Sequence, residues 1–349
     1  MPILNKGENF MRLARREVPE YIPTYSLFWA FNMPPFLMGE RNPDGTGKDM
    51  FGVESVRDSA GLLPPMSKTS DFILTDITKW RDVIKIPDFD ISDSAWADMA
   101  KQANDMRDPE LPFGGGVSMG FFQPLMSFMG FTEGLSACFE EPEEVKALFD
   151  YLSNWSVEMT KKYIYYYKPE FGFLGDDIAH ERNPFMSLEM FQELIAPYWR
   201  AYYKVFVDAD QPVGHPNCGH FELYLDDLVD MGVSFWDPVQ SSNDEDAIKA
   251  KFGNDLALCG GPEMRYWDDD TPDEQIRAEV EDYINRLAPG GGFAMFDFIY
   301  MPEPPEPDPD APEDEELPTV MTMNMSEGER HRMGIVRDVY EELRYSFYD

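Results

Sequence analysis

The chain has 349 residues, of which 43% are hydrophobic, and this is enough to bury a sizeable core. Its 66 acidic and 29 basic residues give a formal net charge of −37, which argues against nucleic acid or an anionic membrane surface as a partner, because both need clustered Lys and Arg. No run of about 18 apolar residues is present, and residues 1–20 lack the apolar core of a secretory signal, so we expect a cytoplasmic protein without a membrane span.

The first part of the chain contains one predicted helix and one predicted strand before a long irregular segment. Residues 1–20 have the apolar spacing of an amphipathic helix, which predicts an N-terminal helical extension. The aromatic run at residues 21–29 is the first predicted strand. Residues 32–108 are rich in Pro, Gly and Met, and we expect short helices and one further strand within them.

From residue 111 onward, strand-like and helix-like segments alternate. Helices are predicted to begin at Pro142, which suits a first helical turn, and after Ser187, which suits an N-cap. Strands are predicted in residues 111–118, 171–175, 211–214, 233–239, 256–259 and 292–298. With the first strand this makes seven, and the alternation predicts one (β/α)8 TIM barrel, of the α/β class, over residues 1–349.

Much of the acidity is local. Residues 301–318 consist almost entirely of Pro, Asp and Glu, which predicts an acidic, Pro-rich surface loop inserted in the barrel. The remaining negative charge has two interpretations, a well-solvated surface or attraction to a basic partner protein.

Two carboxylates stand at the end of the predicted strand 171–175. Asp176 and Asp177 follow an apolar run directly, and His180 and Arg182 come within the next few residues. In a barrel the loops after the strands converge on one face, so these groups are candidates for acid chemistry or for binding a substrate. The alternative is a structural acidic pair at the beginning of a helix.

A second group of polar residues follows the strand 211–214. His215, Cys218 and His220 carry nitrogen and sulfur atoms that zinc accepts, and a catalytic zinc needs three protein ligands with one open position. The alternative is a polar turn whose His215 and Cys218 line the site without metal. Cys259, at the end of another strand, is a third candidate ligand or a small buried residue.

Aromatic and Met residues are concentrated in segments 21–38 and 116–131. They either fill the core or form a binding surface for a flat aromatic or macrocyclic ligand. The residues that we predict to contact substrate are Phe28, Trp29, Phe31, Met119, Phe121, Arg182 and Trp236.

Several phrases occur in an order that resembles the uroporphyrinogen decarboxylase superfamily, and within it the corrinoid-dependent methyltransferase branch. They are residues 49–53 (DMFGV), 141–145 (EPEEV), 175–177 (GDD), 217–219 (NCG) and 230–240 (DMGVSFWDPVQ). The resemblance spans most of residues 20–300. It implies a (β/α)8 barrel with its site at the carboxyl ends of the strands.

The sequence departs from two branches of this superfamily. Decarboxylase members bind the acidic side chains of a porphyrin with an Arg-rich N-terminal loop, whereas residues 28–36 here contain no arginine. Thiol-alkylating members hold zinc with a His-x-Cys pair and a distant Cys. Here Pro216 stands two residues before Cys218, His215 is one residue out of register, and Asp297 lies in the last strand region, where no Cys is found. A zinc site would thus rest on His215, Cys218 and Asp297.

The resemblance therefore implies the first methyltransferase of an O-demethylase system. Such an enzyme moves a methyl group from a methyl ether, often aromatic, to the cob(I)alamin of a separate corrinoid protein, and this chain has no corrinoid-binding signature of its own. Asp177 and His180 are our first choices for protonating the leaving oxygen, with Asp176 placing them.

Three other functions stay open: a zinc-dependent methyltransferase from methylcobalamin to a thiol, a porphyrinogen decarboxylase, and a non-catalytic module that binds a corrinoid protein. The sequence does not define the small-molecule methyl donor or the oligomeric state.

Overall fold

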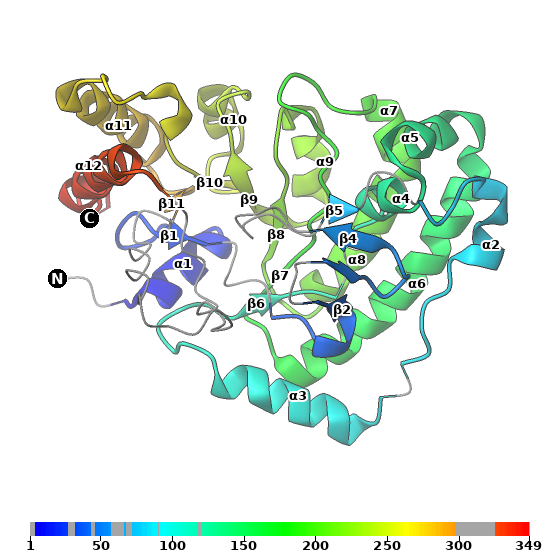
Figure 1. Ribbon diagram of the computed structural model, residues 1–349. Coiled ribbons are helices and arrows are strands. Elements are labelled where there is room, and N and C mark those ends of the chain that lie inside the picture. Colours follow the sequence, from blue (N-terminus) through cyan, green and yellow to red (C-terminus); the bar gives the residue numbers. More distant parts are fainter. Residues whose placement is uncertain are drawn as a thin grey trace, which may run out of the picture.

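The computed structural model describes residues 4–26, 32–42, 46–56, 66–67, 72–89, 91–117, 120–296 and 325–348 (Figure 1). Its main feature is a sheet of seven parallel strands in the order β1-β11-β10-β9-β8-β7-β6. The strands are β1 (Thr24–Tyr25), β6 (Gly114–Gly115), β7 (Phe171–Phe173), β8 (Val213–Pro216), β9 (Val233–Val239), β10 (Ala257–Gly260) and β11 (Phe293–Phe296). Each overlaps one of the seven predicted strands, so these predictions are confirmed.

Helices follow the strands along the chain and lie around the sheet (Figure 1). They are α1 (Lys6–Ala14), α2 (Trp80–Val83), α3 (Asp93–Asp105), α4 (Phe122–Met129), α5 (Phe131–Glu140), α6 (Pro142–Tyr167), α7 (Leu188–Leu194), α8 (Ala196–Val207), α9 (Leu225–Asp230), α10 (Glu245–Phe252), α11 (Asp273–Leu287) and α12 (Glu327–Leu343). Pro142 is the first residue of α6. The Ser187 hydroxyl caps α7 by accepting the Met190 N–H at 3.2 Å, as predicted.

The sheet is curled, because side chains from strands that are not neighbours meet on its inner side. The rings of Phe171 on β7 and Phe235 on β9 lie 5.5 Å apart between centroids, and Tyr25 on β1 lies 5.6 Å from Phe235. Phe10 of α1 packs against Phe171 at 5.9 Å and against Phe235 at 5.4 Å, so α1 closes the amino-terminal end of the barrel. Aromatic rings thus fill the barrel interior, as in a packed (β/α)8 core.

Two glycines make room for these rings. A Cβ atom on Gly114 would lie 2.1 Å from the Phe171 ring, and one on Gly214 would lie 2.1 Å from the Phe235 ring. Real Cβ atoms do not approach a ring this closely, and interiors are packed too tightly to yield freely. Glycine is therefore required at both positions for the interior to be filled by aromatic residues.

The expectation of a further barrel strand within residues 32–108 is wrong for the part of this segment that the structure describes. The segment instead contains a separate antiparallel sheet of β2 (Glu40–Arg41), β3 (Thr46–Lys48), β4 (Glu54–Val56) and β5 (Met66–Ser67). These four strands pair with one another and not with the parallel sheet. The Asn32 side chain does reach β6, donating a hydrogen bond to the Gly114 carbonyl at 2.9 Å.

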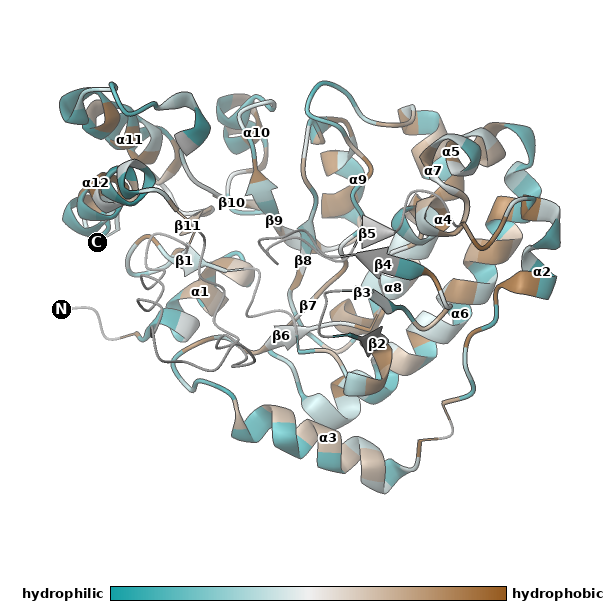
Figure 2. Ribbon diagram, viewed as in Figure 1, coloured by the Kyte–Doolittle hydropathy of each residue, from teal (hydrophilic) through white to brown (hydrophobic). Residues whose placement is uncertain are grey.

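The outer helices bury one apolar face each, and α11 is an example. The buried residues of α11 recur every three or four positions: Ile276, Val280, Tyr283, Ile284 and Leu287. Figure 2 shows hydrophobic and hydrophilic residues interleaved along α11 and α12, which lie side by side. The C-terminal helix α12 contacts the segment before β1, where the Tyr340 hydroxyl donates a hydrogen bond to the Ile22 carbonyl at 2.8 Å. In the described residues we find no helix that combines the length and apolarity needed to cross a membrane.

Candidate functional site

The carboxyl ends of β7 to β10 bring together polar groups that lie far apart in the sequence. On β9 the side chains alternate, so Asp237 faces the same inner side as Phe235, two residues before it. On β10, Cys259 faces inward in the same way as Ala257, and both belong to the interior cluster that contains Phe235. The Tyr25 hydroxyl on β1 lies near the Asp237 carboxyl and affects its pKa. Asp237 therefore stands above the aromatic layer at the end of the barrel where parallel strands place their chemistry.

Asp237 has the most unusual environment of this group. It is 1% exposed, and its Oδ1 atom has no hydrogen-bond partner among the described residues. Burial raises the pKa of its carboxyl to about 8; the Tyr25 hydroxyl opposes this rise, and the Asp177 charge adds to it. Burial and the Asp177 charge thus both favour the protonated form of the Asp237 carboxyl. Sequence analysis did not find it, although the alternation from Phe235 on a strand that ends in Asp-Pro was an available signal.

Asp177, on the loop after β7, is half-buried, and it lies near enough for its charge to act on the Asp237 carboxyl. Its Oδ1 accepts the backbone N–H of Cys218 at 2.9 Å, and its Oδ2 accepts the side-chain amide of Gln123 at 3.3 Å. Burial raises the pKa of Asp177, and these two donors oppose the rise because they favour the charged form. The predicted residue Asp177 is thus at the strand ends, where its charge raises the pKa of both Asp237 and Cys218.

The Asp176 side chain accepts hydrogen bonds from the N–H groups at the beginning of α4. Its carboxylate accepts the backbone N–H groups of Phe121 at 2.8 Å, Phe122 at 3.1 Å and Gln123 at 2.8 Å, and the Trp199 indole N–H at 2.9 Å. It is fully buried, and burial raises its pKa to about 6 against the effect of these four donors. Both of its oxygens accept hydrogen bonds from the protein, which suits the role of placing Asp177 that the sequence analysis gave it.

Three other predicted site residues face outward, into the layer between the sheet and the helices. The centroid of the His215 ring lies 4.3 Å from that of the Trp199 ring on α8. His215 Nδ1 and the Tyr203 hydroxyl share a hydrogen bond of 2.6 Å. Trp236, its partner on β9, donates its indole N–H to the Asn217 carbonyl at 2.9 Å. Phe121 packs against α6 and α8 (rings of Phe149 at 5.9 Å and Tyr198 at 5.5 Å). Phe121 and Trp236, predicted to contact substrate, and His215, predicted as a metal ligand, are all fully buried in this layer and do not face the inner side of the sheet.

We expect His215 to stay neutral from pH 5 to pH 8. Complete burial lowers its pKa to about 3, because a charged imidazole would lose its hydration among aromatic rings. Long-range ¹H–¹⁵N NMR of the histidine rings across this pH range is the measurement. A His215 ring that titrates near pH 6.5 would contradict the assignment of its side chain to the core.

The described residues do not assemble the zinc set that the sequence suggested. Cys218 lies at the end of β8 with part of its surface exposed, while the surrounding protein partly desolvates its thiol; this desolvation and the charges of Asp177 and Asp237 raise its pKa to about 12. His215 faces the helices, and Asp297 lies outside the described residues. Within the described ranges, no three His, Cys, Asp or Glu side chains are grouped as metal ligands.

His180 and Arg182 lie on an exposed rim around the strand ends. The His180 carbonyl accepts the His220 N–H at 2.9 Å, and the His180 ring accepts the Arg182 backbone N–H at 3.3 Å. Gly219, with φ at +85°, packs so closely on His180 that a Cβ would lie 2.8 Å from its backbone. The loops after β7 and β8 are therefore held together, but the His180 ring is not among the inward-facing groups.

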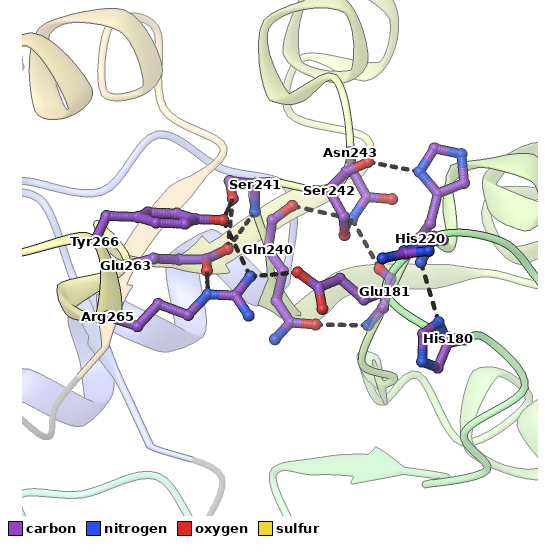
Figure 3. A network of polar contacts seen from close by, with 12 residues as sticks. His180, Glu181, His220, Gln240, Ser241, Ser242, Asn243, Glu263, Arg265 and Tyr266 are labelled. Carbon is purple, nitrogen blue, oxygen red and sulfur yellow. Dashed lines mark hydrogen bonds and ion pairs between the residues drawn. The ribbon is translucent and has the colours of Figure 1, made fainter.

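A chain of polar contacts continues this rim across four loops (Figure 3). We call it the rim network; its labelled residues are His180, Glu181, His220, Gln240, Ser241, Ser242, Asn243, Glu263, Arg265 and Tyr266. Arg265 after β10 pairs with Glu181 after β7 at 2.9 Å and also contacts Glu263. Glu263 accepts the Ser241 N–H at 2.7 Å, and Gln240 accepts the Gly219 N–H at 2.6 Å. The network fixes the positions of the loops around Asp177 and Asp237.

A hollow of about 460 Å³ lies on the outer side of this network, between the loop after β10 and helix α11. Its lining includes Ser241, Glu245, Glu263, Tyr266, Trp267 and Tyr283. Asp177, Cys218 and Asp237 do not line it, so this hollow is separate from the candidate site at the carboxyl ends of the strands. Of the other predicted substrate residues, Phe28, Trp29, Phe31 and Met119 lie outside the described residues.

Comparison with known proteins agrees with this architecture. Among curated proteins, none matches the sequence. A solved structure of a methyltransferase from Methanosarcina mazei superposes with a TM-score of 0.62 at 11% sequence identity, covering 97% of this chain and 99% of that one, and so shares the fold. The family model of uroporphyrinogen decarboxylase (URO-D) matches residues 72–295. The chain therefore belongs to the uroporphyrinogen decarboxylase family.

Proposed function

We propose that this protein is a methyltransferase that moves a methyl group from a methyl ether, such as a methoxylated arene, to the cob(I)alamin of a separate corrinoid protein. The observation that carries the proposal is the pair of carboxyl groups, Asp177 and Asp237, at the carboxyl ends of β7 and β9. Cob(I)alamin is a strong nucleophile, but an alkoxide or phenoxide leaves poorly unless its oxygen is protonated. A carboxylic acid that stays protonated at neutral pH supplies that need.

The same groups disfavour porphyrinogen decarboxylation. A polycarboxylate substrate needs cations to bind it, whereas the described residues that face inward at this end include Tyr25, Phe173, Asp237 and Cys259. Arg265, on the rim, is already paired with Glu181 and Glu263. Anionic side chains at the site would repel such a substrate.

Two further alternatives are less well supported. A zinc-dependent methyl transfer to a thiol would need His215 or a replacement for it, and His215 faces α8 instead. A non-catalytic module that binds a corrinoid protein would have no need of a buried carboxyl group without a hydrogen-bond partner, because such a group costs stability. The soluble methyl donor and the corrinoid protein enter as co-substrates, and we expect the corrinoid to approach the barrel at the rim network.

The test is methyl transfer with the full chain. Purified protein, chemically reduced cob(I)alamin and a panel of methoxyarenes are expected to give methylcobalamin, seen as a change in the cobalamin spectrum. Asp177→Asn is expected to lower the rate about 10-fold or more, since the carboxyl pair is broken. Asp226→Asn, on the exposed face of α9, is the matched control and should leave the rate unchanged. Lack of methylcobalamin with every donor would refute the proposal.

A further inference from the structure

We infer that Asp237 donates the proton to the leaving oxygen of the methyl donor, with Asp177 as its charged neighbour. This assigns the acid to a residue that the sequence motifs did not indicate, and it defines the class of donor as one whose leaving group departs as an anion unless protonated. The inference rests on the proposed function.

The geometry favours Asp237 over each of the other acids considered. Asp176 already accepts four hydrogen bonds at the beginning of α4. His180 is exposed on the rim. Asp177 accepts two N–H donors, which stabilise a carboxylate rather than an acid. Asp237 faces the barrel interior with an Oδ1 atom for which the described residues provide no partner.

A buried polar atom without a partner is unusual in folded proteins and calls for a reason, of which a catalytic function is one. At the carboxyl end of a barrel strand, a bound ligand is the natural partner. The aromatic rings of Tyr25 and Phe173 belong to the interior cluster around Phe235, so the neighbourhood of Asp237 is apolar. An ether oxygen is a weak acceptor, and an apolar surrounding strengthens the hydrogen bond that a neutral carboxyl group donates to it.

Of the titratable groups near Asp237, Asp177 disfavours ionisation of its carboxyl and the Tyr25 hydroxyl favours it. Asp177 after β7 is negative, and its charge opposes ionisation of Asp237. Cys218 after β8, Cys259 on β10 and Tyr203 on α8 all have raised pKa values, so they remain uncharged at neutral pH. The Tyr25 hydroxyl on β1 partly favours the charged form and so limits the rise. Two neighbouring carboxyl groups kept in different protonation states are the usual arrangement for one acid and one charged partner.

The step balances without a further reactant. The electron pair of cobalt(I) forms the bond to the methyl carbon, and the methyl–oxygen bond breaks with its electron pair going to oxygen. The Asp237 proton moves to that oxygen, so the products are methylcobalt(III), a neutral phenol or alcohol, and the Asp237 carboxylate. Water then returns a proton to Asp237.

The experiment compares leaving groups in the wild type and in Asp237→Asn. The donors are 4-methylanisole, anisole, 4-cyanoanisole and 4-nitroanisole, whose phenols become progressively better leaving groups, with reduced cob(I)alamin as acceptor. Asp237→Asn is expected to lower kcat/KM by about 100-fold or more for anisole but by less than about 5-fold for 4-nitroanisole, because nitrophenolate needs no proton. A purely structural function would lower kcat/KM by the same factor for all four donors, and that result would overturn the inference.

Asp177→Asn is the second variant and keeps the proton donor. In the wild type, kcat/KM for anisole is expected to fall as the pH rises through about 8, where Asp237 loses its proton. Removing the neighbouring charge makes ionisation easier, so this fall should move to lower pH in Asp177→Asn. An unchanged profile in Asp177→Asn would also overturn the inference. Failure of the wild type with all four donors would instead refute the proposed function, and the inference with it.

Discussion

Replacing Asp176 with alanine is expected to destabilise the protein by about 3–5 kcal/mol, because it removes the acceptor of four buried hydrogen bonds. The N–H groups of Phe121, Phe122 and Gln123 belong to the first turn of α4, where no helical carbonyl is available to accept them. The Trp199 indole would lose its acceptor as well. The midpoint of urea unfolding measures the effect.

Asp177→Ala is the matched control for this prediction. The two residues are adjacent, but Asp177 is half-buried and accepts one backbone N–H and one long side-chain hydrogen bond. We expect it to cost about 1 kcal/mol. Asp176→Asn should also be strongly destabilising. The asparagine NH2 group would replace one acceptor oxygen and would face the N–H groups that this oxygen accepts in the wild type. A loss of stability in Asp176→Ala no larger than that in Asp177→Ala would show that α4 does not depend on this carboxylate.

Gly214→Ala is expected to be the second most damaging of the changes considered, at about 2–4 kcal/mol. The added methyl group would lie 2.1 Å from the Phe235 ring, which is enclosed by Phe10, Tyr25 and Phe171 and has no free space to enter. The cause is overpacking and not backbone strain, because Gly214 does not have a positive φ. Thermal and urea unfolding of the purified variant are the measurements.

A second substitution separates overpacking from other causes. Phe235→Leu shortens the side chain that the methyl group would strike, so the loss in the double variant should be smaller than the sum of the two single losses. Gly175→Ala is the control on the neighbouring strand end, where the nearest atom is Pro216 Cγ at 3.5 Å, an ordinary contact. It should change stability by less than about 0.5 kcal/mol. Strictly additive losses would contradict the assigned cause.

The local elements could be read from the sequence because they depend on neighbouring residues. Ser187 caps α7 through its own side chain, and Pro142 begins α6 because its fixed φ suits a first helical turn. The short apolar runs became strands for the same reason. The antiparallel sheet β2–β5 was missed, since its strands are two or three residues long and carry no clear alternation.

The candidate site could be predicted only in part from the sequence. Sequence analysis placed Asp177 and Cys218 after strands, and both are found at the strand ends. It did not predict that His215, Trp236 and Phe121 are buried between the sheet and the helices, because the position of a residue along the chain does not say which side of the sheet its side chain faces. That side is set by pairing with neighbours, and the register between β8 and β9 shifts between Val213 and Gly214. One such shift exchanges the inner and outer residues of a strand relative to its partner.

The sequence by itself determined the alternation of strands and helices, the barrel class and the acidic character of the chain, because these follow from composition and short-range pattern. Tertiary structure alone decided that Asp176 holds α4 while Asp177, one residue later, faces the site. It also decided that Asp237 lies beside Asp177, 60 positions away in the sequence. Burial and a neighbouring charge raise the pKa of Asp237, and both depend on contacts between distant residues that exist only after the sheet has curled.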